Sequence, residues 1–321
     1  MVNRVKEVLG IEKPVIQGAM AFTSLSPLVS AVSNAGGLGV LGLGYMPKDA
    51  SIAEINKTKK LTEKPFAVNA IMQEGIVEQA DEVLIATKPP VVYADAMRLN
   101  GALCQKYFPR WHKLGMKIIV KASYLADAVT AEKAGADLVV VKGWEGGGHV
   151  SFESTMALVP QVVAAINIPV VAAGGIVDGH SGAAAFALGA EGIEMGTAFL
   201  VADELPINDK AKQAIIAAGD MATAEVSYAN DAPFRMIANN LSDQIKDLEA
   251  THLKAEAAQK EAGLDAKTIK MGMYQGDTQN GAIMVGQDLS LIKETKSVKQ
   301  IIVDVLQDTK NVLQSLQNVE L

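Results

Sequence analysis

Eight short runs of apolar residues, rich in Val and Ile, recur along roughly the first 200 residues. Their hydrophobicity is continuous rather than alternating, which is typical of strands buried on both faces. The pattern therefore predicts eight strands of a parallel sheet covered by helices. The runs are VIQG (15–18), GLGVLG (37–42), FAVN (66–69), VVYAD (91–95), KIIVK (117–121), LVVVKG (138–143), VVAAGG (170–175) and GIEMGT (192–197).

The segments between these strands carry helical signals. SPLVSAVSNAGG ends in glycines that can stop a helix, and SYLADAVTAEKAGAD has apolar residues at helical spacing. Eight strand–helix units fit a (β/α)8 TIM barrel, in which functional groups gather at the C-terminal ends of the strands. A doubly wound open sheet is the alternative α/β fold. VLIAT (83–87) competes for the position of the fourth strand.

The pattern changes after residue 204, where long polar helices are predicted without any strand. FRMIANNLSDQIKDLEATHLKAEAAQKEAG is one of these helical stretches. MYQGDTQNGAIMVGQ (273–287) interrupts them with small and amide residues, and an amphipathic helix is predicted from about 292 to 317. We therefore expect a barrel of residues 1–204 and 273–321, and a smaller α-helical cap of residues 205–272.

Composition and charge narrow the class of protein. Of 321 residues, 49% are hydrophobic and 20% are charged, which is typical of a globular protein. The net charge of −7 argues against nucleic acid or an anionic membrane as the main partner, and would repel an acidic carrier protein unless a basic patch reverses the sign locally. Cys104 is the only cysteine, so we expect no intrachain disulfide and no thiolate metal cluster. Charges interrupt every apolar stretch near the N-terminus, and no segment resembles a membrane span, so we expect a cytoplasmic protein.

Glycines follow the last two predicted strands. Gly174 and Gly175 end the seventh strand, and Gly196 and Thr197 end the eighth. In TIM barrels the loops after these two strands commonly bind a phosphate through backbone N–H groups. The glycines could instead serve only to form tight turns. Because there is no Walker-type lysine loop, the phosphate would belong to a sugar phosphate, pyridoxal phosphate or FMN.

Two other strand ends have little side-chain cover, namely QGAM (17–20) and EGGGH (145–149). A flavin ring needs flat walls of small residues and backbone donors near its N5 atom and carbonyl edge, so we favour FMN. The second stretch also places His149, whose imidazole titrates near neutral pH, directly after three glycines.

Motifs at six of the strands, taken in order, carry a resemblance to a known family. They are QGAMAF, AVSNAGGLGVLG, KPFAVN, GWEGGGHV, IPVVAAGGIVDG and GAEGIEMGTAFLVADE, joined by YQGDTQNGAIMVGQ near the cap. The chain resembles the FMN-dependent nitronate monooxygenase (2-nitropropane dioxygenase) and enoyl-acyl-carrier-protein reductase II family over most of its length, least over residues 70–116 and 205–270. The resemblance implies a TIM barrel that binds FMN beneath a helical cap.

The resemblance also implies roles for particular residues. His149 would be the catalytic imidazole above the flavin, and Lys121 would stabilise an anionic reduced flavin. Glu145 would either position His149 or cap the glycine turn, and Met273 has an alternative role as a packing residue. The residues expected at the cofactor are Gly18, Ala19, Met20, Asn69, Lys121, Glu145, Gly147, Gly148, Ala173, Gly174, Gly175, Gly196, Thr197, Met273 and Gln275. The other histidines, His112, His180 and His252, are expected to be surface or core residues.

Two reactions suit this site. An enoyl reductase would use NADH or NADPH to reduce an enoyl thioester, with acyl carrier protein as a candidate partner, whereas a nitronate monooxygenase would oxidise a small nitronate with O2. The segments AGGLGVLGLGYMPKDA and TMALVPQVVAAINIPVVAAGGI favour the reductase. YADAM (93–97) departs from the reductase pattern, and Ala198 departs from both patterns. Lys121 and MYQGD (273–277) are closer to the monooxygenase and NADH:quinone reductase relatives. The choice between reductase and oxidase therefore stays open, with an NADH:quinone reductase as a further alternative.

The remaining alternatives are a barrel enzyme that binds a sugar phosphate and a non-enzymatic flavin-binding protein. A homodimer is compatible with the sequence, which does not fix the number of subunits.

Overall fold

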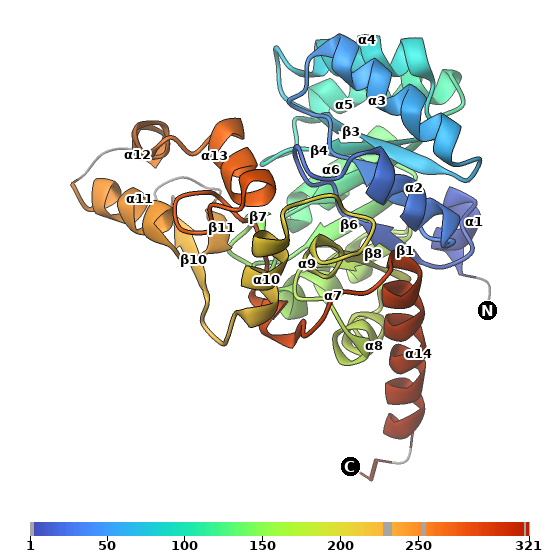
Figure 1. Ribbon diagram of the computed structural model, residues 1–321. Coiled ribbons are helices and arrows are strands. Elements are labelled where there is room, and N and C mark those ends of the chain that lie inside the picture. The colour runs from blue at the N-terminus through green and yellow to red at the C-terminus, as the bar shows by residue number, and fades with distance from the viewer. Residues whose placement is uncertain (1–2, 227–232, 252–254, 318, 321) are drawn as a thin grey trace.

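Eight parallel strands surround the centre of the molecule in the computed structural model, which describes residues 3–226, 233–251, 255–317 and 319–320 (Figure 1). Their order in the sheet is β1-β9-β8-β6-β5-β4-β3-β2. The strands are β1 (Val15–Gln17), β2 (Gly39–Leu41), β3 (Phe66–Ile71), β4 (Val91–Asp95), β5 (Lys117–Ala122), β6 (Leu138–Lys142), β8 (Val170–Ala173) and β9 (Gly192–Met195). Each of the eight predicted runs corresponds to one of these strands, and β3 and β5 extend two residues and one residue beyond their runs.

The two edges of this sheet meet at β1 and β2. The Leu38 N–H donates to the Val15 carbonyl at 2.9 Å, and the Gln17 N–H donates to the Leu38 carbonyl at 2.9 Å. The sheet is therefore a nearly closed barrel with flanking helices, which confirms the predicted TIM barrel over the doubly wound sheet.

Helices follow the strands and cover the outside of the barrel (Figure 1). They are α2 (Ser26–Asn34), α3 (Lys48–Leu61), α4 (Val77–Thr87), α5 (Gly101–Lys113), α6 (Leu125–Ala134), α7 (Thr155–Ala165), α8 (Gly179–Ala187) and the short α9 (Thr197–Leu200). VLIAT (83–87) belongs to α4, so it is not a strand. Asp81 and the buried Trp111 join α4 to α5 through a 3.0 Å hydrogen bond.

The barrel interior is filled from one end by apolar side chains. Alternate residues of the strands, including Val91, Tyr93, Leu138 and Val140, form one buried cluster. Helix α1 (Arg4–Leu9) adds Val5 and Leu9 to that cluster from the N-terminal ends of the strands. This end is therefore packed, which leaves the C-terminal ends of the strands for a binding site.

The segment after residue 204 contains strands that the sequence analysis did not predict. β10 (Thr223–Val226) and β11 (Phe234–Ile237) are antiparallel, and β11 also pairs with β7 (Gly148–His149). FRMI is thus a strand rather than the start of a helix. Its four residues are all buried, so they lack the alternation that marks a half-buried strand. The helices of this segment are α10 (Asp209–Ala217), α11 (Asn240–Ala250), α12 (Ala255–Ala262) and α13 (Ala266–Lys270).

The chain returns to the barrel after α13. A π-helix, η1 (Met271–Gln275), is followed by a segment without regular structure, by the 3-10 helix η2 (Gln287–Leu291) and by α14 (Val298–Leu316). Helix α14 packs against α8, where a Cβ atom on Gly179 would lie 2.3 Å from the Cβ of Asp308. Only a glycine permits that approach.

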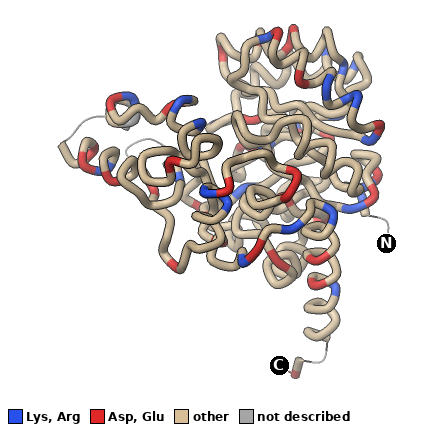
Figure 2. The backbone as a smooth tube through the Cα atoms, viewed as in Figure 1, with Lys and Arg blue, Asp and Glu red and all other residues tan. Residues whose placement is uncertain are grey.

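Acidic and basic residues are interspersed along the described chain (Figure 2). Among the described residues, no helix combines the length and apolar character needed to cross a bilayer. The division into a barrel and a cap of residues 205–272 stays a prediction.

Candidate active site

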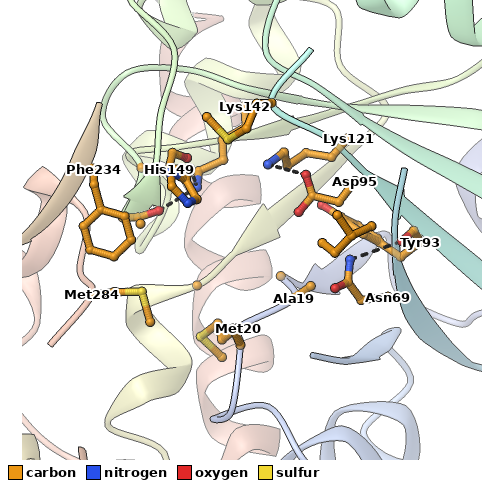
Figure 3. A pocket seen from close by; sticks show the side chains of 18 of the residues that line it. Ala19, Met20, Asn69, Tyr93, Asp95, Lys121, Lys142, His149, Phe234 and Met284 are labelled. Carbon is orange, nitrogen blue, oxygen red and sulfur yellow. Dashed lines mark hydrogen bonds and ion pairs between the residues drawn. The ribbon is translucent and has the colours of Figure 1, made fainter. Parts of the chain in front are cut away.

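A cavity of about 1110 Å³ opens at the C-terminal ends of the barrel strands. Its walls come from strand ends, from the segment around His149, and from residues between β11 and η2 (Figure 3). The volume lies at or above the upper end of the range for pockets that hold one drug-sized ligand, about 300–1,000 Å³, so there is room for a cofactor and a substrate. Fourteen of the sixteen predicted site residues line it: Gly18, Ala19, Met20, Asn69, Lys121, Gly147, Gly148, His149, Ala173, Gly174, Gly175, Gly196, Thr197 and Met273.

Two predicted residues lie outside the lining. The Glu145 carboxylate accepts hydrogen bonds from the Thr155 N–H at 2.9 Å and from the Thr155 hydroxyl at 2.8 Å. It therefore holds the start of α7, a structural contact that differs from the expected cap of the glycine turn. Gln275 is exposed at the end of η1. Of the other histidines, His112 pairs with Asp137, His180 is exposed, and His252 lies outside the described residues.

One end of the cavity, formed by Gly174, Gly175, Gly196 and Thr197, has the features of a phosphate site, and we call it the phosphate-like end. Gly174 and Gly175 have φ angles of 91° and 75°, a left-handed conformation that favours glycine. A Cβ atom on Gly196 would meet nothing within 4 Å, so this wall has open space in front of it. Thr197 is fixed by the Gly286 N–H, which donates to its hydroxyl at 2.9 Å. Backbone and hydroxyl groups here could bind a phosphate without a lysine.

Asp288 lies beside this end and was not predicted. It lines the cavity, and its Oδ1 atom is buried without a hydrogen-bond partner in the described part of the chain. Burial raises the pKa of Asp288 to about 6, against a lowering effect of the Thr197 side chain.

The floor of the cavity carries charges on neighbouring strands. Lys121 on β5 forms an ion pair with Asp95 on β4, with Nζ and Oδ1 2.6 Å apart (Figure 3). The Tyr93 hydroxyl, also on β4, donates to the Glu194 carboxylate of β9 at 2.8 Å. Burial raises the pKa of Glu194 to about 7. Asp95 belongs to YADAM (93–97), the segment that departs from the reductase pattern, so this departure supplies the ion-pair partner of Lys121.

Residues 143–149, which we call the histidine bend, carry His149 from β6 to the edge of the cavity. His149 pairs with Phe234 of β11, and the two rings meet edge to face with centroids 5.1 Å apart. The buried Arg235 of β11 donates to the carbonyls of Gly146 at 3.1 Å and Trp144 at 3.0 Å, and forms an ion pair with Glu225. The unpredicted strands β10 and β11 thus fix the position of the histidine.

The three consecutive glycines of the bend, Gly146, Gly147 and Gly148, each have a structural reason to be glycine. A Cβ atom on Gly146 would lie 2.4 Å from Cε of Lys142, and one on Gly147 would lie 2.6 Å from the main chain of Val285. Gly148 has a φ angle of 68°. These three glycines therefore have structural reasons of their own, and all three also line the cavity.

The site residues that sequence reasoning missed are mostly polar or charged side chains on the barrel strands. They are Tyr93, Asp95, Lys142, Glu194 and, after β9, Asp288. A charge at the end of a buried strand is the signal that could have identified Asp95, Lys142 and Glu194, as it did for Lys121.

Comparisons with known proteins identify the family and the fold of the chain. A sequence model of the family described as nitronate monooxygenase matches residues 3–88 and 82–308. A probable nitronate monooxygenase of Staphylococcus saprophyticus is 34% identical and aligns with 81% of this chain and 87% of its own. The (3aS,4S,5R,7aS)-5-hydroxy-7a-methyl-1-oxo-octahydro-1H-indene-4-carboxyl-CoA dehydrogenase of Rhodococcus jostii is 30% identical across 94% of each chain. The solved structure of FabK from Thermotoga maritima has a TM-score of 0.91 and 35% identity, covering 99% of each chain.

Proposed function

The chain belongs to the nitronate monooxygenase family and is an oxidoreductase, and from this premise we propose that it uses FMN and NADH or NADPH to reduce an enoyl thioester. Members of this family are typically flavin-dependent. The glycine turns of the phosphate-like end, the open space before Gly196 and the small residues Gly18 and Ala19 fit FMN.

The observation that carries the choice of substrate is the set of apolar side chains that the end of β3, the segments after β3 and β4 and helix α13 add to the cavity lining. They are Ile71, Met72, Met97, Leu103 and Ile269, and they lie among the polar residues Gln73, Glu74, Arg98 and Asn100 of the same lining. A small nitronate does not need this space, whereas an acyl chain would fill it. Methionine side chains adapt to the shape of such a chain.

Two relatives support a thioester substrate. FabK, an enoyl-acyl-carrier-protein reductase II, covers nearly the whole chain at 35% identity. The Rhodococcus dehydrogenase is named for a carboxyl-CoA thioester. The probable nitronate monooxygenase of Staphylococcus is the reason to retain nitronate oxidation as the second candidate.

Bound FMN would supply the transfer of a hydride between the nicotinamide and the β-carbon of the substrate. Reduction of the carbon–carbon double bond also needs a proton at the α-carbon, and we assign its donation to the imidazole of His149. The edge-to-face contact with Phe234 would hold the ring at the cavity edge. Lys121, paired with Asp95, would place a positive charge at the cofactor floor.

Residues 205–272 would act as a cap over the substrate. Phe234, Leu264, Asp265 and Ile269 from this segment line the cavity. We also propose acyl carrier protein or coenzyme A as the carrier and a homodimer as the assembly. The net charge of −7 would disfavour an acidic carrier, so a comparison of both thioesters is informative.

Rapid anaerobic mixing tests the proposal. NADH or NADPH should bleach the enzyme-bound flavin, and crotonyl-CoA or crotonyl-acyl-carrier protein should restore its absorbance. In a parallel experiment, a propyl nitronate is mixed with the oxidised enzyme. Bleaching by the nitronate, with no reoxidation by either thioester, would replace enoyl reduction by nitronate oxidation. A quinone that alone restores the absorbance would identify a quinone reductase.

A further inference from the structure

Lys142 lies beneath the histidine bend, at the end of β6. Its Nζ atom donates to the carbonyl oxygens of Gly147 at 2.6 Å and His149 at 3.0 Å (Figure 3). Arg235 donates to the carbonyls of Trp144 and Gly146. The two cations together therefore hold four carbonyls within residues 144–149 of the bend. Hydrogen bonds from charged donors are about twice as strong as neutral ones.

The two cations belong to different elements. Lys142 is the last residue of β6, and its main chain pairs with Ala173 of β8. Its stem packs closely under the bend, where a Cβ atom on Gly146 would lie 2.4 Å from Cε of Lys142. Arg235 approaches from β11 instead. The bend that carries His149 is therefore positioned from the barrel by Lys142 and from the segment after residue 204 by Arg235.

The charge of Lys142 depends on its surroundings. The pKa of Lys142 is lowered to about 8, first by burial and then by the nearby charge of Lys121. Asp95 and Glu194 act in the opposite direction, while Arg235 repels the ammonium group. The ammonium form holds the two carbonyls more strongly than the neutral amine does, because the amine donates without charge assistance.

We propose that Lys142 is a positioning residue, which sets the place of the His149 imidazole through the two carbonyls that it holds. This inference rests on the proposed role of His149 in the reaction. It predicts that loss of the ammonium group moves the imidazole without removing the cofactor site. A displacement of about 1 Å at a reacting group can lower a rate by about 100-fold.

The test compares Lys142→Met, Lys142→Arg and a control, Lys212→Met, in the full-length FMN-loaded enzyme. Lys212 is also buried and donates to one main-chain carbonyl, that of Ala202 at 2.6 Å, but does not line the cavity. Three quantities are measured: the Kd for FMN, the circular dichroism of the bound flavin, and kcat from about pH 6 to pH 10.

We expect Lys142→Met to bind FMN within about threefold of the wild type and to lose kcat by about 10- to 100-fold below about pH 8, with a smaller deficit at higher pH, where the wild-type lysine is also uncharged. Lys142→Arg, which stays charged, should recover much of that loss. The wild type should lose kcat above about pH 8 as Lys142 is deprotonated, and the arginine variant should lack this decline. The flavin dichroism should change in Lys142→Met and not in Lys212→Met.

A wild-type kcat and pH profile in Lys142→Met would overturn the proposal. So would a large loss of FMN affinity with an unchanged kcat, because Lys142 would then be a cofactor ligand. If Lys142→Met does not fold, the high-pH behaviour of Lys142→Arg decides alone. If the wild type turns over none of the candidate substrates, the proposed function fails, and the flavin dichroism of the same variants still decides the positioning role.

Discussion

His149 occupies an exposed position at the cavity edge, on a bend held by Lys142 and Arg235. The walls of the proposed FMN site are formed by other residues, so truncation of this side chain should separate turnover from binding. We expect His149→Ala to bind FMN with unchanged affinity and to lose about two to four powers of ten in kcat, the range for acid–base assistance. Stopped-flow reduction and reoxidation of the flavin measures this.

His180→Ala is the matched control for that experiment. His180 is also exposed but lies on α8, away from the cavity. It should behave as the wild type. A His149→Ala enzyme with an unchanged rate would remove the imidazole from the reaction.

Asp288 should make FMN binding depend on pH. Burial raises its pKa to about 6, so the carboxyl is neutral below that pH and can donate to a phosphate, whereas above it the anion repels a phosphate dianion. The wild-type affinity should therefore weaken as pH rises from 5 to 7.5. Asp288→Asn should bind FMN about tenfold more tightly than the wild type at pH 7.5 and nearly equally at pH 5.

Titration of FMN fluorescence at each pH measures both affinities. Because the FMN phosphate also titrates near pH 6, the ratio of the two Kd values, not either value alone, carries the result. A ratio that is constant with pH would show that Asp288 does not face the phosphate.

The charged residues at the cavity floor, Asp95, Lys121 and Lys142, point inward, and the sequence alone does not show that direction. In β4, β5 and β6 the inward residues alternate, as Val91 and Tyr93 or Leu138 and Val140 show. Asp95, Lys121 and Lys142 continue these inward series at the strand ends. Because both faces of each strand are apolar, the sequence has no alternation from which to read which residues point inward.

At the scale of elements, the barrel strands were predictable and the strands after residue 204 were not. The eight barrel runs are continuous, Val- and Ile-rich and separated by helical segments, so their type and order followed directly. β10 and β11 have four residues each, and the partner of β11 is the two-residue β7. That pairing depends on tertiary contact between Arg235 and the histidine bend, which a local pattern does not record.

The junction between β9 and α9 offers a test of the phosphate site. At Gly196 the φ angle is −114° and an added Cβ meets nothing, so Gly196→Ala should change the free energy of unfolding by less than about 0.5 kcal/mol. If a phosphate occupies the open space, the same change should weaken FMN binding at least tenfold. Urea unfolding and FMN titration measure the two effects.

Gly179→Ala should show the reverse pattern. Its Cβ would overlap Asp308 where α8 meets α14, so we expect destabilisation by about 1–3 kcal/mol from overpacking, without a direct effect on FMN affinity. For the Gly196→Ala variant, an unchanged FMN affinity would show that the phosphate does not bind in the open space before Gly196.

At the scale of the whole molecule, the cavity joins parts of the chain that are far apart in sequence. Its lining includes Gly18 after β1, Gly174 after β8, Phe234 on β11 and Met284 before η2. A ligand that touches all of these stabilises their common arrangement relative to the unfolded chain. Binding of the cofactor should therefore be visible in the stability of the entire protein.

Thermal unfolding with FMN and with riboflavin tests this at the level of the intact chain. At 100 times its Kd, FMN should stabilise the protein by about 2.7 kcal/mol, which corresponds to about 4 °C in Tm for a chain of this length. Riboflavin has the same ring and no phosphate. Loss of the hydrogen bonds to the phosphate should weaken its binding about 100-fold, so at the same concentration it should raise Tm by less than about 1 °C. Because the ring contacts alone would stabilise the protein equally with either ligand, equal shifts would contradict the phosphate-like end. The absence of a shift with both would contradict flavin binding itself.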